Sequence, residues 1–143
     1  AMSELNRAAA RALQAAAVRG ATDVTGFSFV GHAWEMAAQS GVDLLIDLDS
    51  LPLLPGAQRY AGEWLFPGGT ERNYRFYVPH LRQERPLTDE MLRLLLTPET
   101  SGGLLVAVPA DGVEVFERTL RAENGRAWPI GEAVPGEGLI HLR

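Results

Sequence analysis

Apolar side chains recur with helical spacing in the first third of the chain. In residues 3–19 they fall near one face of a helix, and Gly20 follows where a left-handed C-terminal cap would lie. A second run, over residues 29–37, has the same spacing and ends at Ser40-Gly41. We therefore expect two helices here, separated by a turn over residues 21–27.

Further helices are predicted downstream. Thr88 can cap one whose first turn holds two acidic residues, which suit the positive end of the helix dipole. Asp111 can cap another that stops at Asn124-Gly125. Residues 57–64 can form one or two helical turns. Residues 51–56, which hold two prolines, are expected to form a turn or a short helical piece, and loops are expected over residues 67–73 and 74–86.

Strands are predicted between these helices. Near alternation of polar and apolar residues favours a strand over residues 42–48, and an apolar run favours a buried one over residues 104–108. Two closing strands are expected at residues 127–130 and 139–142. This succession of strands and helices predicts an α+β fold, with helices packed on a sheet.

The composition bounds the class of protein. A chain of 143 residues fits one domain with a single core. Its net charge is −5 and its arginines are scattered, so it lacks the basic stripe that nucleic acids require. No apolar run approaches the ~20 residues of a membrane span. We expect a cytoplasmic protein with neither a nucleic-acid nor a membrane partner.

Two residue types are missing. The chain has no cysteine, and all 13 of its basic residues are arginines. Disulfides, thiolate metal sites, a thiol nucleophile, a Schiff base and a phosphate-binding P-loop lysine are therefore excluded from it. Any chemistry must use carboxylates, hydroxyls, histidine, arginine or the backbone.

Asp23 is the first candidate for a functional residue. It lies between two threonines in a glycine-containing turn, where its carboxylate could ligate a hard cation such as Mg²⁺. The competing interpretation is that Asp23 only caps the helix or turn that follows, a common role for aspartate. His32, in the first turns of that helix, could be a metal ligand or a proton shuttle, although a buried structural histidine is the commoner case.

Two polar, glycine-bearing loops could bind an anion. Residues 100–103 (TSGG) offer two hydroxyls and two unhindered backbone amides. Residues 68–73 (GGTERN) are similar but weaker. The competing interpretation is a tight turn whose glycines permit close packing for residues 100–103, and a surface turn for residues 68–73. By themselves these residues supply part of a site.

Four segments together resemble the C-terminal domain of the selenophosphate synthetase family, in the wider superfamily of aminoimidazole ribonucleotide synthetase. They cover nearly the whole chain in order: ATDVTGF (21–27) with GH (31–32), LP (51–52) with PG (55–56), GGTERN (68–73) and TSGGLL (100–105). The resemblance implies a three-layer α/β/α domain of the α+β class, with a mixed and partly ferredoxin-like sheet.

The resemblance also implies an activity for a longer parent protein. In this family ATP, selenide and water give selenophosphate, AMP and phosphate. Residues 1–143 would be the single C-terminal domain of a two-domain chain. The absent N-terminal domain would carry the nucleotide segment, the catalytic cysteine or selenocysteine, and a lysine. We therefore expect no catalytic residue here, an inactive isolated domain, and a homodimeric parent.

Site residues follow from the same resemblance. Asp23 matches an aspartate that joins N-terminal-domain aspartates around Mg²⁺ on the ATP phosphates, and is the expected metal ligand. The other two motifs supply the residues expected to bind the cofactor: Gly69, Thr70, Asn73, Thr100, Ser101, Gly102 and Gly103.

The chain departs from the family pattern at two positions. Ser28 stands where the family has glycine after Thr-Gly-Phe, and Thr97 stands where an acidic residue precedes Pro98. Two alternatives remain for the parent: a related enzyme such as the purine-pathway synthetase or a thiamine-phosphate kinase, or a protein in which this fold is a non-catalytic interaction domain.

Overall fold

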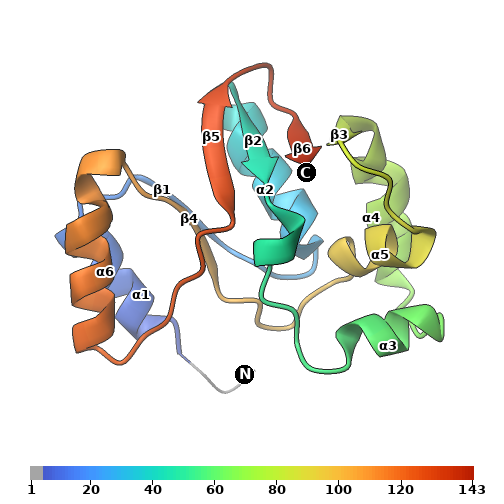
Figure 1. The fold of residues 1–143 in the computed structure, drawn as a ribbon, viewed down its shortest axis with the longest axis horizontal. Helices are drawn as coiled ribbons and strands as arrows, with labels where there is room; N and C mark the ends of the chain where they lie inside the picture. Colours follow the sequence, from blue (N-terminus) through green and yellow to red (C-terminus); the bar gives the residue numbers. More distant parts are fainter. Residues whose placement is uncertain (1–4) are drawn as a thin grey trace.

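Two helical groups are joined by a two-stranded ribbon (Figure 1). The structure is a computed structural model and describes residues 5–143. Helices α1 (Arg7–Ala15) and α6 (Val113–Ala122) pack on each other at one side. Strands β1 (Gly20–Asp23) and β4 (Leu104–Ala107) pair antiparallel and lead from these helices to the rest of the chain.

The remaining strands form a mixed sheet in the order β3-β6-β2-β5. They are β2 (Val42–Ile46), β3 (Leu81–Gln83), β5 (Gly131–Pro135) and β6 (Ile140–Leu142). Strand β2 pairs antiparallel with β5 and parallel with β6, and β6 pairs parallel with β3. Helix α2 (Ser28–Ser40) packs on one face of this sheet. The expected α+β class with a mixed sheet is confirmed.

Three helices lie beside the sheet, on the side of β3 (Figure 1). They are α3 (Ala57–Gly62), α4 (Gly69–Tyr77) and α5 (Asp89–Leu95). Three single turns of 3₁₀ helix complete the described chain: Leu48–Ser50, Val78–His80 and Ala110–Gly112. Among residues 5–143, no helix combines the length and the apolar character that crossing a membrane would require.

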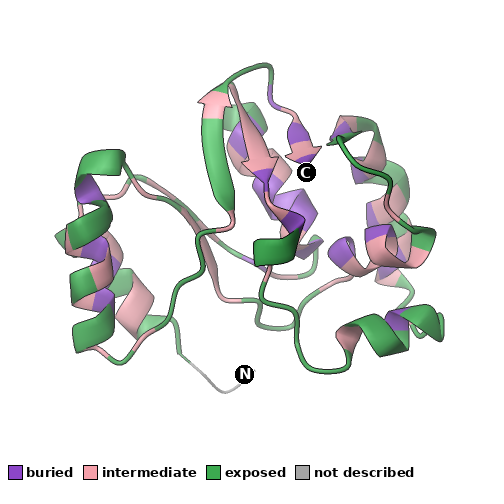
Figure 2. Cartoon of the chain, viewed as in Figure 1, coloured by how far each residue is buried: buried purple, intermediate pink, exposed green. Residues whose placement is uncertain are grey.

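Buried apolar residues form two separate clusters (Figure 2). The larger lies between α2, the sheet and α4–α5, and its fully buried members are Val30, Ala33, Ala37, Leu96, Ile140 and Leu142. The smaller lies between α1 and α6 and is built on Ala12, Phe116 and Leu120. The second group of helices therefore packs on itself at the end of the ribbon, displaced sideways from the sheet.

The observed ends of α1, α2 and α5 can be compared with the predicted ones. Gly41 takes the left-handed conformation at the end of α2 (φ 64°), and Thr88 accepts a hydrogen bond from the backbone N–H of Met91 (3.4 Å), both as expected. The first helix is shorter than predicted. It ends at Ala15, Ala17 takes the left-handed conformation (φ 51°), and Gly20 enters β1. Residues 3 and 4 of the prediction lie outside the described residues.

Five local predictions are wrong. The turn expected over residues 21–27 starts only after β1, because residues 20–23 pair with β4. The loops expected over residues 67–73 and 74–86 contain α4 and β3. Asp111 caps nothing, since α6 follows Gly112 without a side-chain cap. The strand expected at 127–130 is instead β5, a mostly exposed strand whose position is set by pairing with β2.

Asp43 on β2 fixes the turn between β5 and β6. Its Oδ1 accepts hydrogen bonds from the backbone N–H groups of Glu137 (2.8 Å), Gly138 (3.0 Å) and Leu139 (2.8 Å). Its Oδ2 lies 3.0 Å from Nε2 of His141. The Leu139 N–H bond contributes most to holding the pKa of Asp43 at about 2, with the His141 bond and the other two amides adding to it against partial desolvation.

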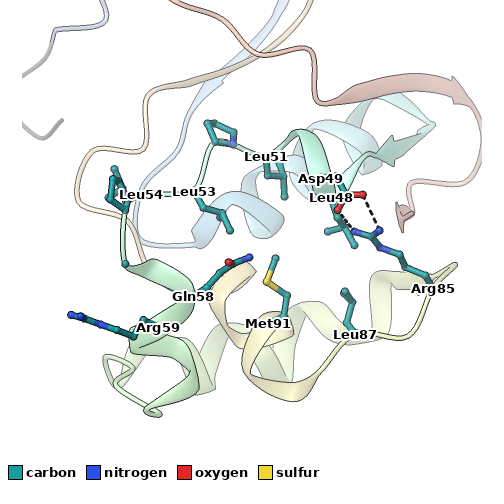
Figure 3. Close-up of a pocket in the computed structure, with 13 residues that line it drawn as sticks. Leu48, Asp49, Leu51, Leu53, Leu54, Gln58, Arg59, Arg85, Leu87 and Met91 are labelled. Carbon is teal, nitrogen blue, oxygen red and sulfur yellow. Dashed lines mark hydrogen bonds and ion pairs between the residues drawn. The ribbon is translucent and has the colours of Figure 1, made fainter.

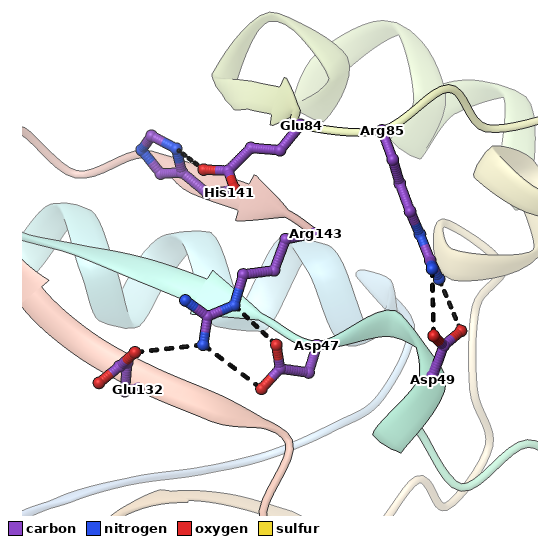
Figure 4. Close-up of polar contacts among 7 residues, drawn as sticks. All are labelled: Asp47, Asp49, Glu84, Arg85, Glu132, His141 and Arg143. Atoms are coloured by element: carbon purple, nitrogen blue, oxygen red, sulfur yellow. Dashed lines mark hydrogen bonds and ion pairs between the residues drawn. The ribbon is translucent and has the colours of Figure 1, made fainter.

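Further ion pairs join the strands of this sheet (Figure 4). Nδ1 of His141 lies 3.1 Å from Oε1 of Glu84. Arg143 donates to Asp47 (2.6 Å), directly after β2, and to Glu132 (3.1 Å) on β5. These pairs form on a partly solvated surface, so each adds little stability by itself. Together they tie the C-terminal strand to its neighbours.

Replacing Asp43 by asparagine should lower stability at pH 6 but not at pH 2. The folded carboxyl has a depressed pKa, so its contribution is present above the unfolded value of 3.8 and is lost as the pH falls through about 2. We expect a melting temperature about 5 °C lower for Asp43→Asn at pH 6. Circular dichroism melts between pH 6 and pH 2 would measure this. If the difference in melting temperature between wild type and Asp43→Asn does not become smaller toward pH 2, the depressed pKa of Asp43 is not its cause.

Candidate functional site

Three of the motifs that carry the family resemblance meet where the ribbon reaches α2 and α4. Residues 23–26, which follow β1, run alongside residues 96–103, which precede β4. We refer to these two segments together as the arch. The N-terminal half of α4, which holds the third motif, packs against the arch.

Backbone hydrogen bonds continue the β1–β4 pairing into the arch. The N–H of Val24 donates to the carbonyl of Gly103 (3.0 Å), and the N–H of Gly102 donates to the carbonyl of Val24 (3.0 Å). Further along, the N–H of Glu99 donates to the carbonyl of Thr25 (3.0 Å). The position of one side of the arch is therefore fixed by the other.

The backbone geometry explains why glycine occupies positions 102 and 103. A Cβ on Gly102 would lie 2.8 Å from Cγ1 of Val24 and 2.5 Å from Oε2 of Glu99, and Gly103 has a φ of +85°. Close approach and a left-handed backbone thus account for both glycines. Thr100 and Ser101 differ, because both are exposed and their hydroxyls make no hydrogen bond within residues 5–143.

The first turn of α4 fits against the other end of the arch. A Cβ on Gly69 would lie 2.6 Å from Cγ of Pro98, so only glycine permits this approach. Thr70, which is 2% exposed, donates to Oγ1 of Thr97 (3.3 Å), and Thr97 donates to the carbonyl of Arg93 (3.0 Å). Thr97, a departure from the family pattern, is thus satisfied inside the protein.

Asn73 joins the two sides of the arch. Its side chain is buried, and its Nδ2 donates to the carbonyl of Gly26 (3.1 Å) on one side and to that of Leu96 (3.0 Å) on the other. Gly69, Thr70 and Asn73 therefore all face the protein interior. Their expected contact with a cofactor stays a prediction.

Asp23 ends β1 at the edge of the arch and is exposed. The capping interpretation is contradicted, because Phe27 is the N-cap of α2 and no side chain caps this helix at that residue. Within residues 5–143 the Asp23 carboxylate makes no hydrogen bond or ion pair. A solvent-facing carboxylate without an internal partner is available to a cation.

His32 fits the structural interpretation. It is buried, its Nε2 lies 3.1 Å from Oγ1 of Thr25, and its ring packs against that of Phe27 with 5.8 Å between centroids. Its Nδ1 lies 3.6 Å from Oε2 of Glu35, one turn along α2. These contacts attach the Thr25 side of the arch to the helix behind it.

Glu99 is a carboxylate of the arch that the sequence analysis overlooked. The residue as a whole is exposed, but the surrounding loop withdraws its carboxylate from water, and this partial burial raises its pKa. Its only sequence signal is its position directly before Thr100. It adds a second acidic group to the arch besides Asp23.

A groove of the described chain lies elsewhere, away from the arch (Figure 3). It has a volume of about 870 Å³ and lies between residues 48–56, α3 and α5. Leucine and proline side chains line it together with polar ones, and Arg85 forms a bidentate pair with Asp49 at one end (2.7 and 3.1 Å). None of the predicted site residues lines it.

The carboxylate of Asp23 could supply one of the ligands of a metal ion, but not a complete metal site. Within residues 5–143 no group of three or more histidine, aspartate or glutamate side chains is placed to hold a metal ion. Mg²⁺ usually takes one or two protein carboxylates and completes its shell with water and phosphate oxygens. Asp23 can supply one such ligand, and other ligands must come from a nucleotide or from residues beyond this chain.

A protein-family model and individual known proteins both match this chain. Residues 1–142 match the family model described as AIR synthase related protein, C-terminal domain. The chain is 42% identical over 133 residues to a selenide, water dikinase of Bordetella bronchiseptica, covering 93% of this chain and 38% of that protein. It is 43% identical over 146 residues to a selenide, water dikinase of Escherichia coli, covering 99% of this chain and 41% of that protein.

A solved structure shares the fold. The crystal structure of the protein tt0281 from Thermus thermophilus superposes with a TM-score of 0.61 at 23% identity, over 92% of this chain and 34% of that one. The chain thus spans about two fifths of the length of the dikinases it matches. The family model covers nearly every residue, so the chain belongs to the family of AIR synthase related proteins, as their C-terminal domain.

Proposed function

We propose that this chain is the C-terminal domain of a selenide, water dikinase and that it contributes Asp23 to a Mg–ATP site. The observation that carries the proposal is the exposed Asp23 carboxylate, which has no hydrogen bond or ion pair within residues 5–143, at the edge of an arch built from the family motifs. The dikinases that match the chain at 42% and 43% identity support the same reaction. The parent would convert ATP, selenide and water to selenophosphate, AMP and phosphate.

The residues of the arch would have different roles. Asp23 would hold Mg²⁺ together with aspartates of an N-terminal domain, and the exposed hydroxyls of Thr100 and Ser101 would donate to phosphate oxygens. When bound, the metal would neutralise the negative charge that develops during phosphoryl transfer. Gly102 and Gly103 keep residues 102–103 close to Val24, which follows Asp23 directly.

An assay on the full-length protein tests the proposal. With Mg²⁺ and ATP, selenide should stimulate the release of AMP and phosphate, followed by ³¹P NMR, and the new signal should be that of selenophosphate. The isolated 143-residue chain is the control and should show no turnover, because it holds only part of the site.

The same assay separates the alternatives. Stimulation by thiamine phosphate or by a purine-pathway amidine, with ADP as the product, would assign the parent to another branch of the superfamily. The absence of nucleotide turnover with any of these substrates would favour a non-catalytic interaction domain.

A further inference from the structure

We infer that Asn73 is a positioning residue that sets the distance between the two sides of the arch, and thereby between Asp23 and residues 100–103. The part that concerns the metal rests on the proposed function. Asn73 makes its contacts from α4, behind the arch, and its amide hydrogens are directed at backbone carbonyls.

The geometry is that of a clamp. One nitrogen, Nδ2, donates to a carbonyl three residues after Asp23 (Gly26, 3.1 Å) and to a carbonyl four residues before Thr100 (Leu96, 3.0 Å). The side chain is 7% exposed, so water does not readily replace these bonds. Because both bonds share one atom, neither side of the arch can move away without breaking a bond.

The chemistry of the position is specific to a primary amide. Two N–H groups on one nitrogen can satisfy two buried carbonyl oxygens, whereas a serine hydroxyl donates only one hydrogen. An aspartate of the same shape would direct carboxylate oxygens at both carbonyls. An alanine would leave the two carbonyls without this donor.

The helix that bears Asn73 is itself held against the arch. Thr70 and Asn73 are one turn apart and lie on the same face of α4, where Thr70 donates to Thr97 (3.3 Å). Gly69 permits contact with Pro98 at the start of this helix. Asn73 therefore lies on a helix that is itself fixed to the arch. Precise positioning of a ligand requires such a rigid support.

The experiment replaces Asn73 in the full-length protein by alanine and by serine. In Asn73→Ala the Mg²⁺ concentration for half-maximal ATP turnover should rise about tenfold, since loss of a group that orients a metal ligand typically costs 10–100-fold in affinity. Asn73→Ser, which can keep one of the two bonds, should lie between wild type and alanine. Ile140→Val, in the buried core of the sheet, is the control for a loss of stability alone and should leave the Mg²⁺ dependence unchanged.

Hydrogen exchange measured by mass spectrometry gives a readout that does not depend on activity. The amides of Glu99 and Gly102, which donate across the arch, should exchange faster in Asn73→Ala and Asn73→Ser but not in Ile140→Val. Unchanged exchange in the arch would overturn the clamp. Faster exchange with an unchanged Mg²⁺ dependence would overturn the positioning role.

The proposed function and this inference can be tested separately. If Asp23→Asn retains wild-type turnover, Asp23 holds no essential metal, and the link from Asn73 to the metal falls with it. The exchange data would still decide whether Asn73 clamps the arch. If Asp23→Asn abolishes turnover and Asn73→Ala raises the Mg²⁺ requirement, both stand.

Discussion

Replacing Asp23 by asparagine in the full-length protein should reduce Mg²⁺-dependent ATP turnover at least about a hundredfold, the scale on which a lost electrostatic contact to a transition state is usually felt. The change keeps the shape of the side chain and removes its charge. Since the carboxylate has no hydrogen bond or ion pair within residues 5–143, folding should be nearly unaffected. Steady-state kinetics at varied Mg²⁺ and thermal melts of both proteins would measure the two effects.

The matched control is Asp111→Asn. Asp111 is also exposed, lies in a 3₁₀ turn before α6, and has no role in the arch. It should leave both turnover and melting temperature close to wild type. If Asp23→Asn lowers the melting temperature but not the turnover, Asp23 is a structural residue and the proposed metal role is wrong.

Ser28→Val should destabilise the chain by roughly 3 kcal/mol, because it combines a strained backbone with the loss of a buried side-chain hydrogen bond in the first turn of α2. Ser28 is fully buried, has a φ of 72°, and accepts a hydrogen bond from the N–H of Gly31 (3.2 Å) through its Oγ. Valine adds a branched Cβ in a left-handed conformation and removes the acceptor. Urea denaturation of the two chains would measure the difference.

Ser28→Gly is the control for this prediction. Glycine relieves the left-handed strain but also removes the Oγ acceptor, and the two effects of about 1 kcal/mol each nearly cancel. We therefore expect stability within about 1 kcal/mol of wild type. A large loss of stability in Ser28→Gly would mean that the hydrogen bond from Gly31 to Ser28 outweighs the backbone strain. This balance explains how serine can occupy a position that is glycine in the family pattern.

Elements with a clear apolar period were predictable from the sequence. The residues of α2 that face the core include Val30, Ala33 and Ala37, which keep a helical period. Helix α4 was missed because the residues it buries in its first turns are Thr70 and Asn73, which carry no apolar signal, and because two glycines precede them. Strand β5 was misplaced because it is mostly exposed and its register depends on β2.

The candidate site was predictable only in part. Residue types and family resemblance marked Asp23 and the two glycine-bearing motifs, but they left capping and ligation as rival roles for Asp23. The structure decides against capping, because the N-cap of α2 is Phe27. The contact of Asn73 with Gly26 and Leu96 joins residues 47 and 23 positions apart, and no local pattern encodes such bonds.

The ribbon of β1 and β4 has a mechanical consequence. It is a two-stranded hydrogen-bonded strip with a separate apolar cluster at each end: one around α1 and α6, the other under α2. Two-stranded strips twist and bend more easily than wider sheets. Since the arch continues this strip, a displacement of α1 and α6 would be transmitted along β1 toward Asp23.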